Sequence, residues 1–398
     1  MQNKILIIGV DGGATKVVAH VVTVDEAGFY ELGKSVAQRQ YQDYPGYDRQ
    51  FKPVPLPAQL ADLQKGFEPT DEEMKQSSAY IQAFADVIRE IAESENQYHV
   101  LIGMGMPGLK TNDKRGIAAL ANGPRMPHFC DLLEEKLEKL DVHLVSPVHK
   151  LGSDADYCGM GETFALDGSF RNVNNAYYLG GGTGVADAMV LNGHLLAFDD
   201  AKPWIAKTWE FKSSGGYSLE RYISAKGVQF LYGESIGIST EELDKKGVYG
   251  QQILEMAQKG DHKAAETIAM VSGHLAKLLF ERMSTLYSGW QSSFEFINET
   301  KTLDPQHPFK GTLLDRIVIG QRLGDWLGLD AGAKMLLEPL KSQLETFILS
   351  SGEEEFIQHY LSGNKLKKGL IKLSSLRAAP ALGAGADAFL NYQKKSTC

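Results

Sequence analysis

The feature of this sequence that most constrains its fold is an internal similarity between two short segments, one in each half of the chain. Residues 10–18 (VDGGATKVV) and 179–187 (LGGGTGVAD) each combine a strand end, a glycine loop with a threonine, and a second strand. Such a repeated hairpin predicts a duplicated fold. Because glycine has no Cβ, each loop lets backbone N–H groups approach an anion closely, and two such loops together suit a polyphosphate.

The first loop also carries side chains that suit a phosphate ligand. Asp11 can hold a hydrated metal ion, while Gly13, Thr15 and Lys16 offer backbone, hydroxyl and ammonium contacts to phosphate oxygens. The sequence contains no Gly-x-x-x-x-Gly-Lys-Ser/Thr motif, and strand rather than helix follows each loop, which argues against a P-loop and against a Rossmann dinucleotide site. For the first loop alone, an ordinary glycine-rich hairpin turn is an equally good interpretation.

Strand and helix patterns alternate along the chain, which predicts an α/β architecture with mixed sheets divided into two lobes. Prolines and polar residues between 38 and 70 predict an irregular insertion or flap. Strands are expected at 4–10, 17–24, 100–106, 142–148, 316–319 and 370–373, with a strand–loop–strand unit over 175–190. Helices are expected at 71–95, 131–140, 157–166, 331–349 and 381–392, with mostly helical structure over 218–286.

Composition excludes several classes of protein. The 398 residues include 41 basic and 50 acidic ones, a formal net charge of −9, and no basic block, so a nucleic-acid partner is not expected. No apolar run approaches the ~18 residues of a membrane span, and the short apolar start lacks the features of a signal peptide, which predicts a cytoplasmic protein without a membrane partner. The widely spaced Cys130, Cys158 and Cys398 suggest neither a disulfide framework nor a zinc site.

Glycine is over-represented in the chain, with 41 residues against roughly 28 expected at the usual ~7%. Five clusters hold 14 of these glycines. We therefore expect ligands to meet the backbone at these clusters, which lie at residues 9–13, 103–108, 180–184, 215–216 and 383–385.

A second group of polar residues, Gly152 to Asp156, follows an expected strand and opens an expected helix. Transfer of a phosphoryl group to an alcohol needs a carboxylate that accepts the hydroxyl proton, and either Asp154 or Asp156 could serve. Aspartates at a helix start also commonly satisfy free backbone N–H groups, and from the residues alone that interpretation is favoured.

A third group lies between the second glycine loop and the long helices, and comprises Glu210, Glu220 and the glycines and serine between them. Carboxylates and hydroxyls suit a polyhydroxylated ligand, although plain helix initiation explains Ser218 to Glu220 equally well. Asn122-Gly123-Pro124 is most simply a turn. The ten histidines form no cluster with metal-ligand spacing.

Taken together, these motifs resemble the ROK family (repressors, open reading frames and sugar kinases) of the actin-like ATPase superfamily, in the family's order. Asp11 to Lys16 is similar to its first phosphate motif, and Gly182 to Val185 is similar to its second. Ser153 to Asp156 resembles the stretch whose aspartate is the catalytic base, which selects Asp154. Further similar segments are Gly103–Gly108 (a strand end), Ala121-Asn122 and Leu219–Tyr222 (sugar contacts), and Ile317–Gly320 (beside the adenosine).

The resemblance implies a two-lobed actin-like (ribonuclease H-like) α/β fold with duplicated mixed sheets and a helical elaboration. Residues 1–150 would form an N-terminal lobe on which helix 386–398 packs, and residues 151–385 a C-terminal lobe. It also implies an ATP- and Mg²⁺-dependent sugar kinase in which Asp154 is the general base and Asp11 holds Mg²⁺ through water, and it allows a homodimer. The implied phosphate contacts are Asp11, Gly12, Gly13, Thr15, Lys16, Gly182, Thr183, Gly184 and Gly320; the implied sugar contacts are Asn122, Ser153, Asp154, Glu210 and Glu220.

Several positions depart from the family pattern. Where the family has a zinc-binding cysteine cluster, this chain has residues 211–217 (FKSSGGY), so no zinc is expected. Only Glu210 is present from the family's Glu-x-Gly-His sugar motif, which leaves the sugar open, and Ser153 stands where the family has Asn. The changes that could loosen nucleotide affinity are Ala14, Ala186, Asp187 and Gln321.

Three other functions fit parts of the pattern. A degenerate or noncatalytic sugar-binding relative, such as a ROK regulator without a DNA-binding domain, is suggested by the missing histidine and by Ala186 and Asp187. A ROK repressor would carry an N-terminal helix-turn-helix domain, whereas here the first phosphate strand is expected by Ile5. An activator ATPase of the same superfamily would need cysteines for an iron–sulfur cluster, and Cys130 and Cys158 are isolated.

Overall fold

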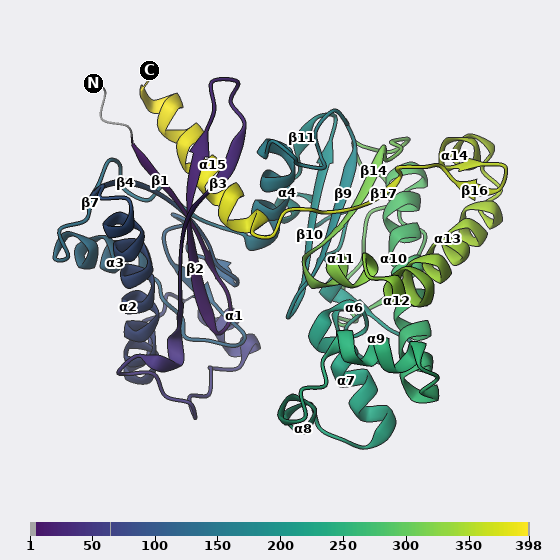
Figure 1. The fold of residues 1–398 in the computed structure, drawn as a ribbon, viewed down its shortest axis with the longest axis horizontal. Helices are drawn as coiled ribbons and strands as arrows, with labels where there is room; N and C mark the ends of the chain where they lie inside the picture. The colour runs from purple at the N-terminus through teal and green to yellow at the C-terminus, as the bar shows by residue number, and fades with distance from the viewer. Residues whose placement is uncertain (1–4, 64, 397–398) are drawn as a thin grey trace. The chain divides into compact units, whose positions relative to one another are not determined.

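The computed structural model describes residues 5–63 and 65–396. The predicted strand start at Lys4 and the last two residues of the predicted helix 386–398, which include Cys398, therefore lie outside the described residues. The chain forms two compact units (Figure 1): unit 1 comprises Met1–Gly168 and Ala378–Cys398, and unit 2 comprises Ser169–Arg377. The division falls after residue 168 rather than at the expected residue 150, which places Asp154 in unit 1.

Unit 1 is built on a mixed sheet in the order β3-β2-β1-β4-β7, with β8 also paired to β4. Neighbours among β3, β2 and β1 are antiparallel, whereas β4 runs parallel to β1, and β7 and β8 run parallel to β4. The strands are β1 (Leu6–Gly12), β2 (Lys16–Val24), β3 (Tyr30–Gln40), β4 (His99–Gly105), β5 (Leu109–Lys110), β6 (Ile117–Ala119), β7 (His143–Leu144) and β8 (Leu151–Gly152). The helices are η1 (Tyr41–Asp43), α1 (Leu56–Leu63), α2 (Asp71–Ser94), α3 (Phe129–Glu138), α4 (Asp154–Phe164) and α15 (Ala379–Ser396).

Unit 2 is built on a sheet in the order β11-β10-β9-β14-β17. The strands are β9 (Ala176–Gly181), β10 (Val185–Leu191), β11 (His194–Leu195), β12 (Phe211–Lys212), β13 (Glu295–Phe296), β14 (Arg316–Gly320), β15 (Leu361–Ser362), β16 (Lys365–Leu366) and β17 (Ile371–Leu373). The helices are α5 (Phe198–Ala201), η2 (Thr208–Glu210), α6 (Glu220–Ile223), α7 (Ala225–Ile236), α8 (Thr240–Lys245), α9 (Gly250–Gln258), α10 (His262–Ser288), α11 (Gln321–Leu327), α12 (Asp330–Gly332), η3 (Ala333–Leu337), α13 (Glu338–Ser350) and α14 (Glu354–Tyr360).

The two main sheets have the same arrangement of strands. In each, an antiparallel hairpin turns at a glycine loop, as β1–β2 in unit 1 and β9–β10 in unit 2. The first strand of each hairpin then pairs in parallel with a later strand, β4 or β14. This repeat confirms the duplicated fold with mixed sheets that the two glycine loops predicted.

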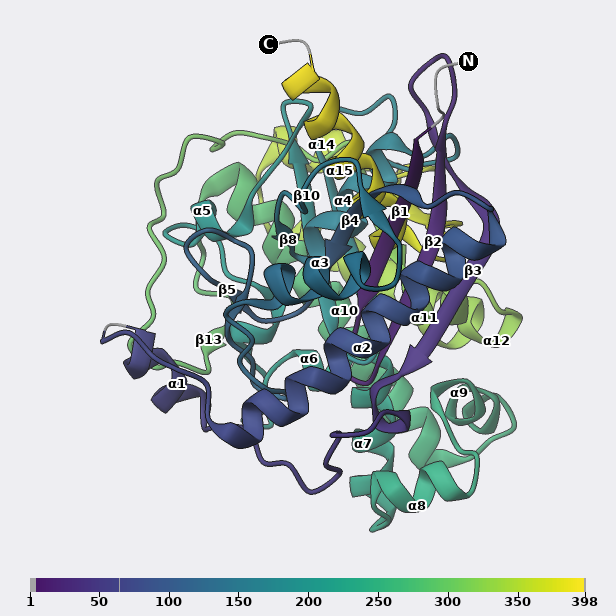
Figure 2. The same ribbon diagram turned by 90° about the vertical axis from the view of Figure 1, so that its left-hand side faces the viewer.

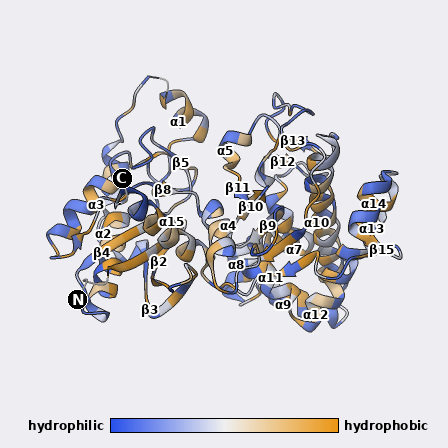
Figure 3. Cartoon of the chain, turned by 90° about the horizontal axis from the view of Figure 1, so that it is seen from above, coloured by the Kyte–Doolittle hydropathy of each residue, from blue (hydrophilic) through white to orange (hydrophobic). Residues whose placement is uncertain are grey.

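One face of the unit 1 sheet is covered by α2, which crosses β1, β2 and β3 (Figure 2). The helix begins as predicted, because Thr70 and Glu73 form a capping box at its start. Hydrophobic residues dominate the central strands (Figure 3), and alternate ones face the helix. The core on this face includes Ile8, Val10, Val100, Ile102 and Met104 of the strands, and Phe84, Val87, Ile88 and Ile91 of α2.

The opposite face of the same strands receives α15, and glycines make this contact possible. A Cβ on Gly9 would overlap the backbone carbonyl of Ala381, and one on Gly103 would overlap that of Ala384. Helix and sheet therefore approach more closely than side chains would allow. At both glycines the backbone of α15 occupies the space in which a ligand was expected, so both are packing positions.

α4 lies against α15 as well (Figure 1), and this contact explains why residues 151–168 belong to unit 1. A Cβ on Gly383 would overlap the Tyr157 carbonyl, and one on Gly161 would lie 2.5 Å from the Ala379 carbonyl oxygen. The Tyr157 hydroxyl also donates to Asp387 (3.0 Å). The glycine cluster at 383–385 therefore serves helix packing rather than ligand binding.

Other elements differ from the predicted pattern in extent. The segment 38–70, predicted to be irregular, contains the end of β3, η1 and α1. The helix α1 can form there because Pro57 falls in its first turn, where proline is tolerated. The strand predicted over 142–148 is reduced to β7, and the helical stretch 218–286 divides into α6 to α10. Among the described residues, no helix combines the length and apolar character needed to cross a membrane.

Candidate functional site

Three parallel strands of unit 1 end side by side, and predicted site residues stand at their ends. The register pairs Asp11 of β1 with Gly105 of β4, and Gly105 with Gly152 of β8. Ser153 and Asp154 follow β8 directly. A Cβ on Gly105 would be in van der Waals contact with the Cα of Asp154, at 3.7 Å. The fold thus brings Asp11 and Asp154, far apart in sequence, to one sheet edge.

The negative charge of Asp154 acts on the carboxyl group of Asp11. Burial, and next the negative charge of Asp154, raises the pKa of Asp11 to about 7, whereas Lys16 lowers it. Two neighbouring carboxylates attract a cation, and Mg²⁺ prefers carboxylate oxygens combined with water and phosphate oxygens. The donor set at this edge therefore fits the Mg²⁺ ion that accompanies a nucleotide.

The loop after β1 is a tight turn of Ala14 and Thr15, closed by a hydrogen bond from the Gly13 N–H to the Lys16 carbonyl (2.9 Å). Ala14 and Thr15 are exposed, and their N–H groups have no acceptor among the residues that the structure describes. The Lys16 ammonium donates to the side chain of Gln38 (2.8 Å). The turn thus offers two adjacent backbone donors to an anion, as the sequence predicted for this loop.

Asp154 is the first residue of α4, and Ser153 is the N-cap of that helix. The Ser153 hydroxyl caps the helix by accepting from the Asp156 N–H at 3.5 Å, and Asp154 also bonds to a backbone N–H of the first turn, as considered for the aspartates. One carboxylate oxygen of Asp154 accepts from the Ala155 N–H (3.0 Å). Its second oxygen has no partner within the described part of the chain, which leaves it available to a hydroxyl group.

Asn122, the predicted sugar contact, is exposed in a turn that the segment 38–70 holds in place. Gln59 of α1 accepts from the Leu120 N–H (2.8 Å) and donates to the Leu120 carbonyl (3.1 Å). A Cβ on Gly123 would lie 3.3 Å from the hydroxyl of Tyr80, which also reaches the first phosphate loop. Gln59 and Tyr80 could not be identified from the sequence, because each contacts the loops across a long sequence separation.

In unit 2, the second glycine loop is fastened to the helices that follow it. The Gly182 carbonyl accepts from the Ala225 N–H (2.9 Å), and the Gly182 N–H donates to the Gly184 carbonyl (2.9 Å). Glu220, predicted to contact sugar, accepts from the Val185 N–H (3.0 Å) and borders Gly184. The Glu220 carboxylate therefore supports this loop in the present geometry, and Thr183 at its tip is exposed.

Gln321 follows Gly320 at the end of β14 and lies over the second loop. β14 pairs Gly320 with Gly180 of β9, which brings the predicted adenosine segment to the base of the loop. A Cβ on Gly182 would lie 2.7 Å from the side-chain oxygen of Gln321. Gln321 has a φ of 57°, in the left-handed region that favours glycine. This backbone agrees with the glycine that the ROK family carries there.

Glu210 and the loop after it are each held by polar contacts of their own. Glu210 forms an ion pair with Lys301 (2.5 Å) and accepts from the Lys207 N–H (2.7 Å). In the loop 211–217, the N–H and hydroxyl of Ser213 both donate to the Tyr217 carbonyl, at 2.8 and 2.9 Å. Hydrogen bonds thus close the loop at which the resemblance places cysteines.

Asp187 does not present a free charge to the second loop, contrary to the expectation from its position. Only 4% of the residue is exposed. Its carboxylate accepts from Tyr177 (2.6 Å), from the Thr208 N–H (2.8 Å) and hydroxyl (2.6 Å), and from Arg282 (3.2 Å), which also pairs with Glu281 (2.9 Å). The charge of Asp187 is compensated inside unit 2, so this substitution gives no reason for weaker nucleotide binding.

The Tyr177→Phe variant tests the contribution of this buried network to stability. Removing the hydroxyl takes away one of the three donors to the same carboxylate oxygen of Asp187, and we expect the free energy of unfolding to fall by about 2 kcal/mol. Urea denaturation measures the change. Tyr287→Phe is the matched control, because that hydroxyl bonds to Glu355 at the surface and its loss should leave stability unchanged within error. Equal effects of the two substitutions would contradict the prediction.

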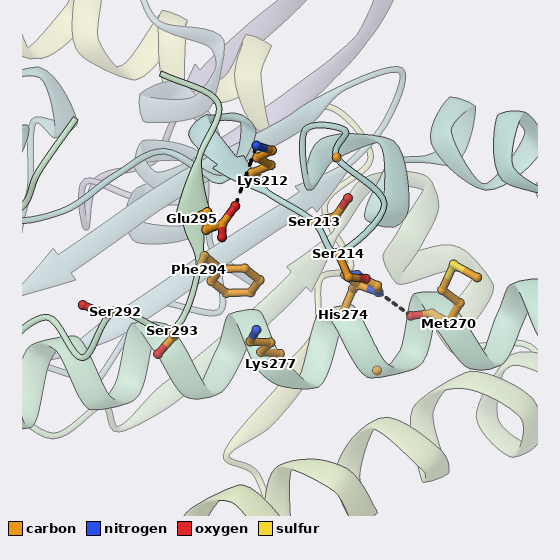
Figure 4. Close-up of a pocket in the computed structure, with 12 residues that line it drawn as sticks. Lys212, Ser213, Ser214, Met270, His274, Lys277, Ser292, Ser293, Phe294 and Glu295 are labelled. Atoms are coloured by element: carbon orange, nitrogen blue, oxygen red, sulfur yellow. Dashed lines mark hydrogen bonds and ion pairs between the residues drawn. The ribbon is translucent and has the colours of Figure 1, made fainter. Parts of the chain in front are cut away.

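A pocket of about 610 Å³ in unit 2 lies between α10, the loop after β12 and the segment that leads into β13 (Figure 4). Its lysine Lys212 is within ion-pair distance of Glu295 (3.7 Å) and Glu299 (3.8 Å), and His274 bonds to a carbonyl of its own helix (2.9 Å). Lys277 lies over an aromatic ring. None of the residues predicted to bind phosphate or sugar lines this pocket.

No protein-family model matches the sequence, and no curated protein matches it. Solved structures match the fold over nearly the whole chain. A ROK hexokinase from Thermus thermophilus has a TM-score of 0.56 at 14% identity, with 98% of this chain and 100% of that chain covered. A ROK family glucokinase from Streptomyces griseus, solved with glucose and AMPPNP, has a TM-score of 0.53 at 15% identity, with coverage of 96% and 98%. A ROK family transcriptional regulator has a TM-score of 0.54 at 11% identity, with coverage of 96% and 78%.

At identities this low, the structural match shows a common fold and nothing more specific. The same fold serves both kinases and a regulator among these structures. The expectation drawn from the motifs, a duplicated actin-like α/β fold of the ROK type, is therefore confirmed. The chain has the fold of the ROK sugar kinases.

Proposed function

We propose that this protein is an ATP-dependent sugar kinase, which transfers the γ-phosphoryl group of Mg²⁺–ATP to a hydroxyl of a hexose or hexose derivative. The observation that carries the proposal is the arrangement at one sheet edge of unit 1. Asp154 stands beside Asp11 there, and Asp11 leads into a turn whose Ala14 and Thr15 N–H groups are unpaired among the described residues. A proton acceptor, a carboxylate that suits Mg²⁺ and donors for phosphate oxygens are the groups that phosphoryl transfer to an alcohol requires.

In this proposal Asp154 orients the sugar hydroxyl and takes its proton as the hydroxyl oxygen bonds to the γ-phosphorus. The bond between that phosphorus and the bridging oxygen breaks at the same time, and ADP leaves with the bridging oxygen. Asp11 would hold the metal, and the turn after β1 would bind phosphate oxygens. Mg²⁺–ATP supplies the phosphoryl group, and the metal offsets the negative charge of the phosphates. The remaining nucleotide contacts are assigned to Gly12, Gly13, Lys16, Gly182, Thr183, Gly184 and Gly320, and the remaining sugar contacts to Asn122, Ser153, Glu210 and Glu220.

A coupled assay of ADP release, run across hexoses, N-acetylhexosamines and their epimers, tests this proposal. We expect at least one sugar to raise Mg²⁺-dependent ADP release well above the rate with ATP alone, with a stoichiometric amount of sugar phosphate in the mass spectrum. A screen in which no sugar stimulates ADP release would contradict a kinase function.

A noncatalytic sugar-binding protein is the second candidate, and the position of Gln321 supports it. The side chain of this residue lies over Gly182, at the loop assigned to nucleotide. Calorimetry with ATP distinguishes the two functions. Mg²⁺-dependent binding of ATP favours the kinase, whereas sugar binding without ATP binding favours the noncatalytic protein.

A further inference from the structure

We propose that Tyr41 and Tyr80 are positioning residues of the first phosphate loop, whose hydroxyls hold two loop carbonyls so that the adjoining N–H groups face a polyphosphate. The inference rests on the proposed function, because it concerns how that loop is prepared for ATP. It also gives a role to the tyrosine- and proline-rich segment 38–70, of which Tyr41 is part.

The strand register brings Tyr41 to the loop. β3 pairs with β2 so that Gln40 lies opposite Lys16, and the next residue, Tyr41, therefore lies opposite Thr15. The Tyr41 N–H donates to the Thr15 carbonyl (3.1 Å), and its hydroxyl donates to the Gly13 carbonyl (3.2 Å). Figure 2 shows β2 and β3 side by side with α2 across them.

Tyr80 reaches the same loop from α2. Its hydroxyl lies 3.4 Å from the carbonyl oxygen of Ala14 and donates to it. Two successive carbonyls of the loop, those of Gly13 and Ala14, are thus bound by hydroxyls from two different elements.

The geometry of the peptide bond converts these contacts into a direction for the N–H groups. In a trans peptide unit the C=O and the N–H of the next residue point in opposite directions. Holding the Gly13 carbonyl therefore turns the Ala14 N–H away from the tyrosines, and holding the Ala14 carbonyl does the same for the Thr15 N–H. These are the two N–H groups that lack an acceptor among the described residues.

The two tyrosines are themselves held firmly. Their rings stack with centroids 3.8 Å apart and planes 21° from parallel, and both side chains are buried. The ring of Tyr41 also lies parallel to that of Phe84, at 6.5 Å. Burial raises the pKa of Tyr41, so its hydroxyl keeps the proton that it donates. A fixed donor orients a peptide unit better than a mobile one, because little entropy is lost when the bond forms.

The test compares three substitutions that each remove one hydroxyl and keep the ring. Tyr41→Phe and Tyr80→Phe remove the donors to the loop. Tyr44→Phe is the matched control, because Tyr44 lies in the same segment and its hydroxyl donates to Asp86 of α2 (2.9 Å) instead. Circular dichroism and thermal unfolding of each variant check that the fold is retained.

Titration calorimetry with Mg²⁺–ATP is the first measurement. We expect the Kd for ATP to rise about fivefold in Tyr41→Phe and in Tyr80→Phe, the effect of losing one hydrogen bond, and to stay unchanged in Tyr44→Phe. Affinity for adenosine, which has no phosphate, should be the same in all four proteins. Wild-type affinity for ATP in both loop variants, or an equal loss in Tyr44→Phe, would overturn the inference.

Spectra of protein labelled with ¹⁵N-alanine and ¹⁵N-threonine supply a readout specific to the loop. ATP should shift the Ala14 and Thr15 amide signals strongly in the wild type and in Tyr44→Phe, and weakly in the two loop variants. Equal shifts in all four proteins would show that the hydroxyls do not direct these amides. If the wild type binds no ATP, the proposed function itself fails, an outcome distinct from a wild type that binds ATP and loop variants that bind it equally well.

Discussion

Asp154→Ala should lower kcat for sugar-dependent ADP release by about three orders of magnitude, the usual contribution of a positioned general base. The substitution removes the carboxylate that takes the hydroxyl proton, while α4 keeps its cap at Ser153 and its packing against α15. We therefore expect thermal unfolding and the Kd for sugar, measured by calorimetry, to stay close to those of the wild type. Turnover at the wild-type rate would refute the role of Asp154.

Asp156→Asn is the matched control for this prediction. Asp156 lies in the same first turn of α4, and the residues alone did not separate it from Asp154 as the proton acceptor. We expect its replacement to leave kcat within about threefold of the wild type, because the half-buried side chain of Asp156 is assigned no role at the reacting atoms. Loss of turnover in Asp156→Asn with full turnover in Asp154→Ala would move the base to the other aspartate.

Asp11→Asn should stabilise the protein at pH 8 in the absence of nucleotide and metal, while it lowers kinase activity at least a hundredfold. In the folded protein the pKa of Asp11 is raised from 3.8 to about 7, so the folded state binds more protons than the unfolded state between these two values. The contribution of Asp11 to the free energy of unfolding is therefore fully present below about pH 4, and it is lost as the pH rises to about 7. The neutral asparagine avoids this loss.

Urea denaturation at pH 4.5 and pH 8 measures the difference. We expect variant and wild type to have similar free energies of unfolding at the lower pH and to differ by on the order of 3 kcal/mol at the higher pH, in favour of the variant. Asp43→Asn, an exposed substitution in the same unit, should show no such pH dependence. A variant that is less stable than the wild type at pH 8 would contradict the raised pKa of Asp11 in the folded protein.

The duplicated fold and the placement of Asp11 could be predicted from the sequence because their causes are local. A hydrophobic strand, a glycine loop and a second strand are all visible within about ten residues, and this pattern occurs twice. The same applies to Asp154, which follows a short strand and opens a helix. The choice of Asp154 over Asp156 depends on the resemblance to the ROK family.

The roles of several other residues depend on contacts between distant parts of the chain, and these are not visible in a sequence. The charge of Asp187 is met by Arg282, and the backbone at Leu120 is held by Gln59. The boundary of unit 1 depends on α15, which follows the whole of unit 2 in sequence. Periodicity and composition report on a residue's neighbours along the chain and say little about partners this remote.

Among the sequence features, the glycine clusters predicted ligand sites least reliably. A missing Cβ permits the close approach of a ligand, and it permits the close approach of a helix equally well. At Gly9, Gly103 and Gly383 the approaching group is the backbone of a helix. In the sequence, the glycine loops at residues 12–13 and 180–184 differ from the packing glycines in one respect. Each loop is followed directly by a second strand.

The late position of α15 has a consequence for how the protein is made. Synthesis proceeds from the N-terminus, so β1, β4 and α4 leave the ribosome long before the helix that covers their shared face. Unit 2 is contiguous, and its full sequence is available while unit 1 still lacks its last helix. The unit that carries Asp11 and Asp154 is therefore completed only after the whole of unit 2 has been translated. A chain released before residue 379 would expose the glycine face of its central strands to water.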